Sequence, residues 1–385
     1  MRILVDALAP KVGGGRTYIL NLLPELLKSD HENSYHLLVS EGQFPELENE
    51  PRLAVHSVKI SLLPHRLAYQ QSVIPFLVKR WKANVLFSTT DITTLAAPCK
   101  VVLAIHNPNP YQNPYPRTSI QHWRLRTLLQ LSRLSVRKAA KVIFVSDYAR
   151  ALASEKLRCS AEKAAVVRHG VSQLYHQDPS QSEELDSKVD LPTERRYILF
   201  VSTLYLYKNP VRLVDAFARC CGRPGFDYDL VIAGRPVDSG TTTELHSRVE
   251  SSGLAHRIHL LGEVAHTEMP ALYRNASLFV FPSYSETFGL PLVEAMASGV
   301  PVVAANASSI PEVTRDAAIY FDPFDVEDMA EKIESVVYDP RLASSLRQRG
   351  LAQARQFSWK RSAEETAKVF RDAYGDSADG QHDGG

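Results

Sequence analysis

Two glutamates, Glu286 and Glu294, bracket the segment Thr-Phe-Gly-Leu-Pro-Leu-Val. The apolar run 277–281 predicts a strand before Glu286, and Pro291 is typical of the first turn of a helix. Glu294 would then lie about one turn into that helix. Both carboxylates would gather at a helix N-terminus, where free backbone N–H groups and the positive end of the helix dipole also point. The amides expected there are those of Phe288, Gly289 and Leu290.

Such a site suits a phosphorylated sugar. Backbone amides can face phosphate or sugar oxygens, and carboxylates can accept hydrogen bonds from hydroxyl groups. By spacing alone, two solvated glutamates on an ordinary strand, loop and helix remain the alternative interpretation.

Other polar residues directly follow predicted strands. Glycines 13–15 open a predicted helix after the first strand, and glycine lets the backbone approach an anion closely. His106 follows the predicted strand 100–105, and a neutral imidazole there could bond a sugar hydroxyl. Lys208 lies in the loop after strand 197–202, before Asn209 as a predicted N-cap and Pro210 as the first helical residue. Arg235 follows strand 229–233.

Two acidic pairs resemble metal ligands and are set aside. Asp227 and Asp229 precede their strand and would lie at the wrong edge of the sheet, and Asp322 and Asp325 sit in a turn without a third ligand. The four cysteines lack metal-ligand spacing and read as reduced. We therefore expect neither a metal nor a cofactor.

Short apolar runs alternate with helical patterns along the chain, which predicts an α/β fold with parallel sheets. The chain has 385 residues, more than one core usually organises, so two doubly wound domains are expected. Ligands in such sheets bind beyond the carboxyl ends of the strands. The predicted strands are 2–6, 35–39, 54–58, 85–88, 100–105, 141–145 and 165–167 in the first half, and 197–202, 229–233, 258–261, 277–281, 301–304 and 318–321 in the second.

The predicted domains are 1–178 and 195–357. The polar segment 179–194 has the composition of a linker, and 375–385 lacks apolar residues and is expected to be disordered. A last amphipathic helix spans 358–374. The N-terminus carries Asp6 where a signal peptide needs an apolar core, so we expect a cytoplasmic protein.

Positive charge is concentrated in one stretch. From Pro51 to Ser146 there are fourteen Lys and Arg residues and one acid, Asp91, although the net charge of the chain is only +1. The segment from Arg117 to Lys141 mixes its cations with leucines and Trp123, which favours contact with an anionic membrane surface. A solvated face is the alternative. Nucleic acid is not expected, because the chain carries no recognised nucleic-acid module.

The segment ETFGLPLVEAMASGVPVV, followed by Ser-Ile-Pro-Glu-Val at 309–313 and by 316–323, resembles the C-terminal half of retaining family-4 glycosyltransferases of the GT-B fold. The resemblance implies two Rossmann-like domains, with the helix 358–374 packing back on the first. It implies that Glu294 binds the ribose of a nucleotide diphosphate sugar, Glu286 the donor sugar and Lys208 the diphosphate.

In the first domain the resemblance places His106 near the donor sugar and the acceptor, and the glycine loop beside them. It assigns Arg235 to the nucleotide base or phosphate. Two departures concern the diphosphate and the histidine: Thr203 and Tyr207 stand where companion arginines are usual, and Asn107 stands where many relatives carry Asp. Stabilisation of the diphosphate is therefore expected from Lys208, helix dipoles and Arg16 or Arg235, and the resemblance places Gly14 and Gly15 beside the donor.

The resemblance predicts a retaining, metal-independent glycosyltransferase that moves a hexosyl group to a lipid-linked or surface-polysaccharide acceptor. GDP-mannose is the leading donor, and the location is the cytoplasm or the inner face of the plasma membrane. Two alternatives stay open: a nucleotide-sugar 2-epimerase of the same architecture, which would interconvert donors without an acceptor, and a non-catalytic GT-B partner subunit.

Overall fold

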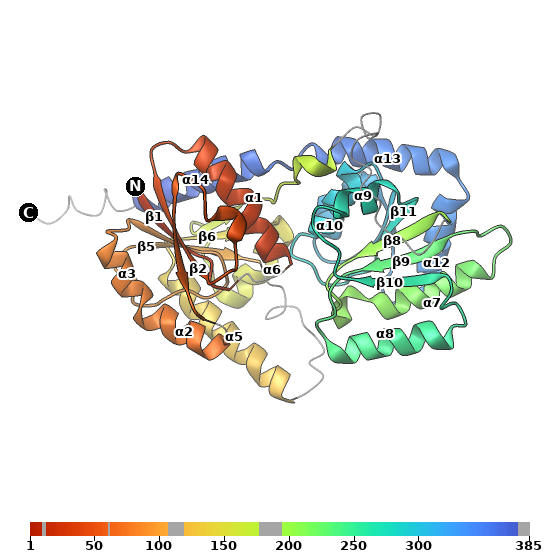
Figure 1. Cartoon of the computed structure of the whole chain (residues 1–385), viewed down its shortest axis with the longest axis horizontal. Coiled ribbons are helices and arrows are strands. Elements are labelled where there is room, and N and C mark those ends of the chain that lie inside the picture. The colour runs from red at the N-terminus through yellow and green to blue at the C-terminus, as the bar shows by residue number, and fades with distance from the viewer. Residues whose placement is uncertain (10–12, 61, 107–118, 177–194, 376–385) are drawn as a thin grey trace, which may run out of the picture. The chain divides into compact units, whose positions relative to one another are not determined.

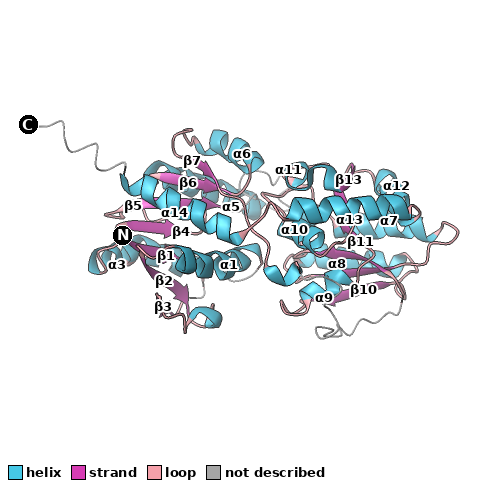
Figure 2. Cartoon of the chain, turned by 90° about the horizontal axis from the view of Figure 1, so that it is seen from above, coloured by secondary structure: helices cyan, strands magenta, loops and turns pink. Residues whose placement is uncertain are grey.

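The computed structural model describes residues 1–9, 13–60, 62–106, 119–176 and 195–375. They form two compact units, Met1–Gly170 with Ser358–Gly385, and Val171–Phe357. Each unit is a parallel sheet with helices on its faces (Figures 1 and 2). Apolar strands covered on both sides explain why the sequence carries near-continuous rather than alternating apolar runs.

The described part of the first unit contains a seven-stranded sheet of order β3-β2-β1-β4-β5-β6-β7, paired in parallel throughout. Its strands are β1 (Arg2–Asp6), β2 (Ser34–Ser40), β3 (Leu53–Val58), β4 (Val85–Ser88), β5 (Lys100–Ile105), β6 (Lys141–Phe144) and β7 (Ala164–Val166). Its helices are α1 (Gly14–Ser29), η1 (Pro45–Leu47), α2 (Leu63–Ser72), α3 (Ile74–Arg80), α5 (Ser119–Lys138), α6 (Asp147–Leu157) and α14 (Trp359–Gly375).

Helix α14 is the last element of the chain and belongs to the first unit. It packs against α1 and contacts β4 and β5, and Phe370 meets Phe87 of β4 edge-on at 5.1 Å between ring centroids. Trp359, Ala363, Ala367 and Phe370 lie on its buried face at helical spacing. Burial of this stripe fixes the C-terminal segment on the N-terminal sheet.

The second unit has a six-stranded parallel sheet of order β10-β9-β8-β11-β12-β13 among its described residues. Its strands are β8 (Tyr197–Val201), β9 (Asp229–Ala233), β10 (Ile258–Gly262), β11 (Leu278–Phe281), β12 (Val302–Ala305) and β13 (Ala318–Phe321). Its helices are η2 (Gln173–Tyr175), η4 (Leu206–Lys208), α7 (Pro210–Cys221), α8 (Ser239–Ser251), α9 (Met269–Arg274), α10 (Leu290–Ala297), α11 (Ile310–Thr314), η5 (Arg315–Ala317), α12 (Val326–Val337) and α13 (Pro340–Ala354).

The predicted α/β class with two doubly wound parallel sheets is confirmed. Every predicted strand is present, with its ends shifted by at most one residue. The predicted linker 179–194 and most of the predicted tail, 376–385, lie outside the described residues, whereas Gly375 is the last residue of α14 rather than part of a disordered tail.

The compact units divide the chain after Gly170, eight residues before the predicted boundary at residue 178. Residues 171–176 belong to the second unit, because the Val171 N–H donates to the Phe357 carbonyl and Tyr175 packs edge-on against Tyr273, with ring centroids 5.7 Å apart. Polar composition marked the linker, but tertiary packing sets the start of the second unit.

Candidate functional site

The strand order of the second sheet reverses between β8 and β11. From this pair of neighbours the chain runs through β9 and β10 on one side and through β12 and β13 on the other. At such a switch point the loops after adjacent strands diverge and leave room for a ligand at the carboxyl edge. Lys208 lies in the loop after β8, and Glu286 in the loop after β11.

Lys208 and Glu286 form an ion pair across this switch point. The Nζ atom lies 2.5 Å from Oε1 of Glu286, and the two side chains are only 12% and 9% exposed. The ammonium also lies 5.2 Å from the centroid of the Tyr207 ring, the residue that replaces an expected arginine. A buried ammonium with three donors can hold Glu286 and still present hydrogen bonds to an anion.

Backbone and side-chain hydrogen bonds tie together the loops that carry this pair. The Tyr284 N–H donates to the Tyr207 carbonyl at 3.0 Å, which joins the loops after β11 and β8. The Glu286 N–H donates to Ser308 Oγ at 3.0 Å, and Ser309 Oγ donates to the Glu286 carbonyl at 3.2 Å. Both the backbone N–H and the backbone carbonyl of Glu286 are therefore held by serine side chains.

Asn209 has a different role from the predicted one. It is the residue before α7, as expected, but it adopts a left-handed conformation (φ 63°) and its side chain caps no helical N–H. Its Nδ2 instead donates to the carbonyls of Pro282 and Pro323, at 3.3 and 2.6 Å. Asparagine tolerates this conformation and supplies two amide donors, so the residue ties the loops after β8, β11 and β13 together.

Glu294 lies in α10, close to a tyrosine that the sequence analysis did not single out. Tyr273 donates to its Oε2 at 3.0 Å. Burial raises the pKa of Glu294 to about 7, and the hydrogen bond from Tyr273 opposes that rise. The pKa therefore lies near neutral pH, and the carboxyl group accepts hydrogen bonds best above it.

The helix start that carries Glu294 is shaped by Gly289. This residue has φ 92° and precedes α10, which begins at Leu290. Phe288 is buried and meets Phe357 edge-on at 5.5 Å between ring centroids. The sequence predicts the amides of these residues at a ligand site, and in the structure they lie at the N-terminus of α10, where the first N–H groups of a helix lack intrahelical acceptors.

Arg235 is exposed at the carboxyl end of β9, on the same edge of the sheet. Gly234 before it needs to be glycine, since a Cβ atom there would lie 1.7 Å from the Ser202 carbonyl oxygen. The Leu204 N–H donates to the Arg235 carbonyl at 2.9 Å. Close approach of these two loops holds Arg235 beside the loop that carries Lys208.

In the first unit the glycine loop begins α1 as predicted. Gly13 has φ 66° and precedes the helix, whose first residues are Gly14 and Gly15. Arg16, a predicted donor contact, forms an ion pair with Glu46. One of its guanidinium nitrogens lies 2.6 Å from Oε1 of the glutamate. The loop follows β1, which neighbours β4 at the strand-order reversal of this sheet.

His106 follows β5 and lies in an aromatic cluster. Its ring stacks on His169 at 5.3 Å between centroids and lies 4.4 Å from Tyr18. Trp359 of α14 completes the cluster beside His169. Burial lowers the pKa of His106 to about 4, so the imidazole is neutral at physiological pH, the form expected from the sequence. Asn107 lies outside the described residues.

The two acidic pairs set aside as metal ligands have protein partners. Asp229 opens β9 at the amino edge and contacts His259 Nε2 at 2.9 Å and Arg257 at 3.5 Å. Asp325 accepts from the first N–H groups of α12, and Asp322 accepts from Phe324 N–H in the preceding turn. No group of three His, Cys, Asp or Glu side chains with metal-ligand geometry occurs among the described residues.

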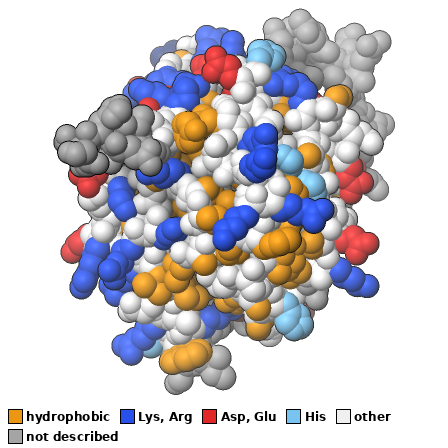
Figure 3. All heavy atoms as spheres, turned by 90° about the vertical axis from the view of Figure 1, so that its left-hand side faces the viewer, with side chains coloured by type: hydrophobic (Ala, Val, Ile, Leu, Met, Phe, Trp, Pro, Cys, Tyr) orange, Lys and Arg blue, Asp and Glu red, His pale blue; other side chains and the backbone are white. Residues whose placement is uncertain are grey.

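The basic helix α5 carries exposed Arg124, Arg126 and Arg137, and Trp123 is 72% exposed. Arg133 differs from the predicted surface cation, because it is partly buried and its Nε donates to the Lys156 carbonyl at 2.8 Å. Arg117 lies outside the described residues. One face of the first unit shows Lys and Arg side chains interspersed with hydrophobic ones and few acids (Figure 3). No helix in the described ranges is long and apolar enough to cross a membrane.

The structure therefore brings Lys208, Glu286, Glu294 and Arg235 to one edge of the second sheet, and the glycine loop and His106 to carboxyl ends of first-unit strands. Sequence reasoning missed Tyr273 and His169. Neither lies in a recognisable motif, and their role rests on contacts with residues 21 and 63 positions away.

Family models match almost the whole chain. The model described as Glycosyltransferase Family 4 matches residues 12–173, and the model described as Glycosyl transferases group 1 matches residues 181–353. Together with the two Rossmann-like sheets, these matches place the chain in the family-4 glycosyltransferases of the GT-B fold.

Among curated relatives, O-antigen chain mannosyltransferase B of Escherichia coli is 31% identical over 250 residues, 64% of this chain and 65% of the relative. A D-inositol 3-phosphate glycosyltransferase of Corynebacterium diphtheriae is 28% identical over 55% of this chain and 51% of its own length. The chain thus spans about half to two thirds of these two relatives.

Solved structures share the fold over nearly the full chain. Sucrose-phosphate synthase of Thermosynechococcus elongatus has a TM-score of 0.81 at 17% identity and covers 98% of this chain and 100% of its own. HepE of Anabaena, solved in complex with UDP-glucose, has a TM-score of 0.78 at 22% identity and covers 96% of this chain and 99% of its own.

Proposed function

We propose that this protein is a retaining glycosyltransferase that moves a hexosyl group, mannosyl in the leading case, from a nucleotide diphosphate sugar to a lipid-linked or surface-polysaccharide acceptor. The observation that carries the proposal is the Lys208–Glu286 ion pair at the β8–β11 switch point, with Glu294 in the helix that follows Glu286. A cation and two carboxylates at that edge match the two chemical halves of such a donor, its diphosphate and its hydroxyls.

The proposed roles are those that the family resemblance assigns, and each fits the chemistry of its residue. Glu294 accepts hydrogen bonds from the ribose hydroxyls, and Glu286 accepts them from the donor sugar. Lys208 neutralises charge on the diphosphate, and Arg235 and the first amides of α10 add donors at the same edge. Lys208 and Glu286 pair with each other, and a bound donor would share the ammonium between the carboxylate and the diphosphate.

In the proposed reaction the bond between the anomeric carbon and the diphosphate oxygen breaks, and its electron pair stays on the diphosphate. The acceptor hydroxyl oxygen then bonds to the same face of the anomeric carbon, and its proton passes to the departing phosphate. Because negative charge grows on the diphosphate as the bond breaks, a preorganised Lys208 would stabilise the transition state more than the ground state.

A metal-independent reaction is part of the proposal. Support comes from the protein contacts already made by the two acidic pairs, Asp229 with Arg257 and His259, and Asp325 with the α12 backbone. GDP-mannose as donor is the proposal that fits the Escherichia coli relative, which is a mannosyltransferase. The exposed arginines of α5 and exposed Trp123 support an acceptor held at an anionic inner-membrane surface.

The test separates nucleotide binding from transfer. Glu294→Ala should weaken binding of the free nucleoside diphosphate, because a ribose contact is made in ground and transition states alike. Glu286→Ala should spare that binding but lower the rate of donor turnover. Calorimetry with GDP, UDP and dTDP measures the first effect, and release of nucleoside diphosphate from the matching sugar donors measures the second.

Glu331→Gln, an exposed change on α12, is the matched control and should alter neither quantity. Equal losses of nucleotide binding in the Glu294→Ala and Glu286→Ala variants would contradict the assigned roles. If the protein interconverts two nucleotide sugars without an acceptor, its activity is epimerisation and not the proposed glycosyl transfer. If the protein neither binds any of the three nucleotides nor turns over their sugars, the remaining interpretation is a non-catalytic subunit.

A further inference from the structure

A pocket of about 540 Å³ opens at the amino edge of the second sheet, opposite the edge that carries Lys208 and Glu286. Its wall includes the residues that come directly before or at the start of β8, β11 and β12, namely Arg196, Ser277, Leu278 and Pro301. Strands of four or five residues rise about 3.3 Å per residue, so the two edges lie roughly 15 Å apart. The pocket is therefore separate from the candidate transfer site.

Three arginines line this pocket without an acidic neighbour. Arg196, Arg274 and Arg347 come from the start of β8, the end of α9 and the middle of α13, and none of the lining residues is Asp or Glu. Within the described ranges none of the three guanidinium groups forms an ion pair. Arg274 makes one long hydrogen bond, 3.4 Å to the Leu174 carbonyl, which leaves most of its donors available.

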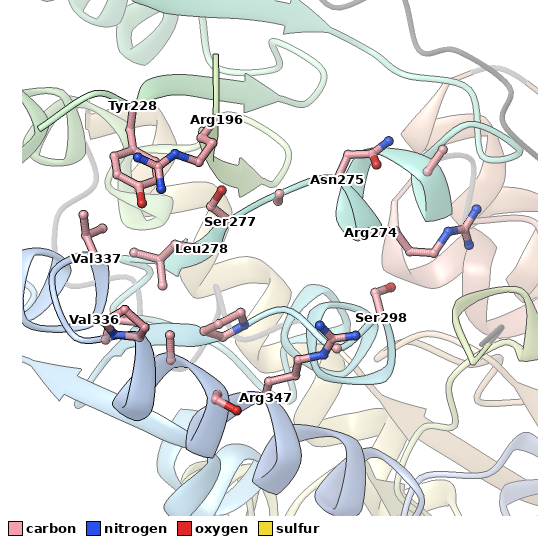
Figure 4. A pocket seen from close by; sticks show the side chains of 17 residues that line it. Arg196, Tyr228, Arg274, Asn275, Ser277, Leu278, Ser298, Val336, Val337 and Arg347 are labelled. Carbon is pink, nitrogen blue, oxygen red and sulfur yellow. The ribbon is translucent and has the colours of Figure 1, made fainter. Parts of the chain in front are cut away.

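Ser298 adds a second, independent observation. Its side chain lines the same pocket and is 7% exposed, yet its Oγ atom has no hydrogen-bond partner among the described residues. Figure 4 shows Ser298, Arg274 and Arg347 in one part of the pocket, and Arg196 against Tyr228 in another. The Arg196 guanidinium lies 4.5 Å from the centroid of the Tyr228 ring. A buried hydroxyl without a partner is costly unless a ligand or solvent satisfies it.

A simpler explanation of the arginines is that they complement helix dipoles. Helices α9, α10 and α12 all end at this edge, and the C-terminus of a helix is the negative end of its dipole. Three of the last four carbonyls of α10, however, already accept hydrogen bonds from the backbone. The N–H groups of Ser298, Gly299 and Val300 donate to the carbonyls of Glu294, Met296 and Ala295, at 3.0, 3.1 and 3.0 Å. Arg347 is not needed as a cap for these carbonyls, so its donors are free for another acceptor.

We propose that this amino-edge pocket binds a small phosphorylated sugar. The guanidinium groups match the fork geometry of a phosphate group. Ser277, Ser298, Ser344 and Asn275 supply hydroxyl and amide partners for sugar hydroxyls, and the Tyr228 ring supports the Arg196 guanidinium. The volume lies in the range of small-molecule sites, and the absence of acids from the lining excludes a cation as the occupant.

The proposal does not depend on the proposed transferase activity, and its test keeps the two apart. Glucose 6-phosphate, inorganic phosphate and uncharged glucose are titrated into the full-length protein by calorimetry. The two phosphates should bind and glucose should not. Arg274→Gln combined with Arg347→Gln should weaken phosphate binding about tenfold or more, since two charge-assisted contacts are lost. Arg341→Gln, on the exposed side of α13 and outside the pocket, is the matched control and should bind as the parent does.

Lys208→Ala distinguishes the two edges of the sheet. Phosphate binding that persists in Lys208→Ala and is lost in the double arginine variant supports the amino-edge pocket. The reverse pattern would place the anion at the nucleotide edge and overturn the proposal, as would no binding of either phosphate at millimolar concentration. Arg196→Gln is a second variant should the double change impair folding, and intact nucleoside diphosphate binding serves as the check that each variant is folded.

Discussion

Replacing Glu294 with glutamine should make the protein more stable and a poorer nucleotide binder at the same time. Burial raises the pKa of Glu294 from 4.5 to about 7. A carboxyl group whose pKa is raised on folding stabilises the folded state below its unfolded pKa, and this stability is lost as pH rises through the folded pKa. The parent protein should therefore lose stability between pH 4.5 and about pH 7, and glutamine has no charge to desolvate.

The size of the effect follows from that shift. A pKa unit is worth about 1.4 kcal/mol, so the ionised Glu294 costs the folded state about 3 kcal/mol above neutral pH. Glutamine keeps an acceptor for the Tyr273 hydroxyl, so the bond seen at 3.0 Å is retained. It loses the charge that favours ribose hydroxyls, and nucleoside diphosphate binding should fall about tenfold or more.

Denaturant unfolding of the parent and Glu294→Gln at about pH 4 and about pH 8 measures the first effect. The variant should gain stability over the parent at the higher pH and little at the lower one. Calorimetry with nucleoside diphosphate measures the second effect, and Glu331→Gln is the control for removal of an exposed carboxylate. A stability difference that does not change with pH would refute the assignment of a raised pKa to Glu294. Unchanged nucleotide affinity would refute its contact with ribose.

Three further predictions concern the Lys208–Glu286 ion pair, metal independence and binding to an anionic membrane. Lys208→Ala should lower turnover about 10²-fold or more and destabilise the protein by leaving Glu286 buried without its cation. Adding Glu286→Gln should restore stability but not turnover, and near-parental turnover in Lys208→Ala would refute its role. Chelation with EDTA should leave transfer intact, and loss of activity that divalent metal restores would contradict the metal-free proposal. Replacing Arg124, Arg126 and Arg137, the three exposed arginines of α5, with glutamine should weaken binding to anionic vesicles at low salt and spare donor hydrolysis. Equal vesicle binding by variant and parent would exclude these arginines as the membrane contact.

Local sequence patterns were sufficient to predict the strands and the helix starts. They also predicted the edge of each sheet at which the candidate site residues lie. Apolar runs identified every strand, since a strand buried on both faces must be apolar along its length. Glycines 13–15 and Pro291 predicted the starts of α1 and α10, and the structure adds that Gly13 and Gly289 have a positive φ, a conformation that glycine adopts without strain. Because the other candidates lie in segments that follow strands, and Glu294 lies near the start of the helix after β11, their position at a carboxyl edge could be predicted without any coordinates.

Contacts between different βα units could not be read in this way. Lys208 and Glu286 are 78 residues apart, and their pairing depends on β8 and β11 being neighbours in the sheet. The same order brings Arg196, Arg274 and Arg347 around one pocket and sets Tyr273 beside Glu294. Arg133, which the sequence presents as one surface cation among several, is bonded to the Lys156 carbonyl instead. Residue type and spacing determine the local conformation and charge of each segment, but side-chain pairing and burial are set by strand order and helix packing, and these are decided only when distant parts of the chain come together.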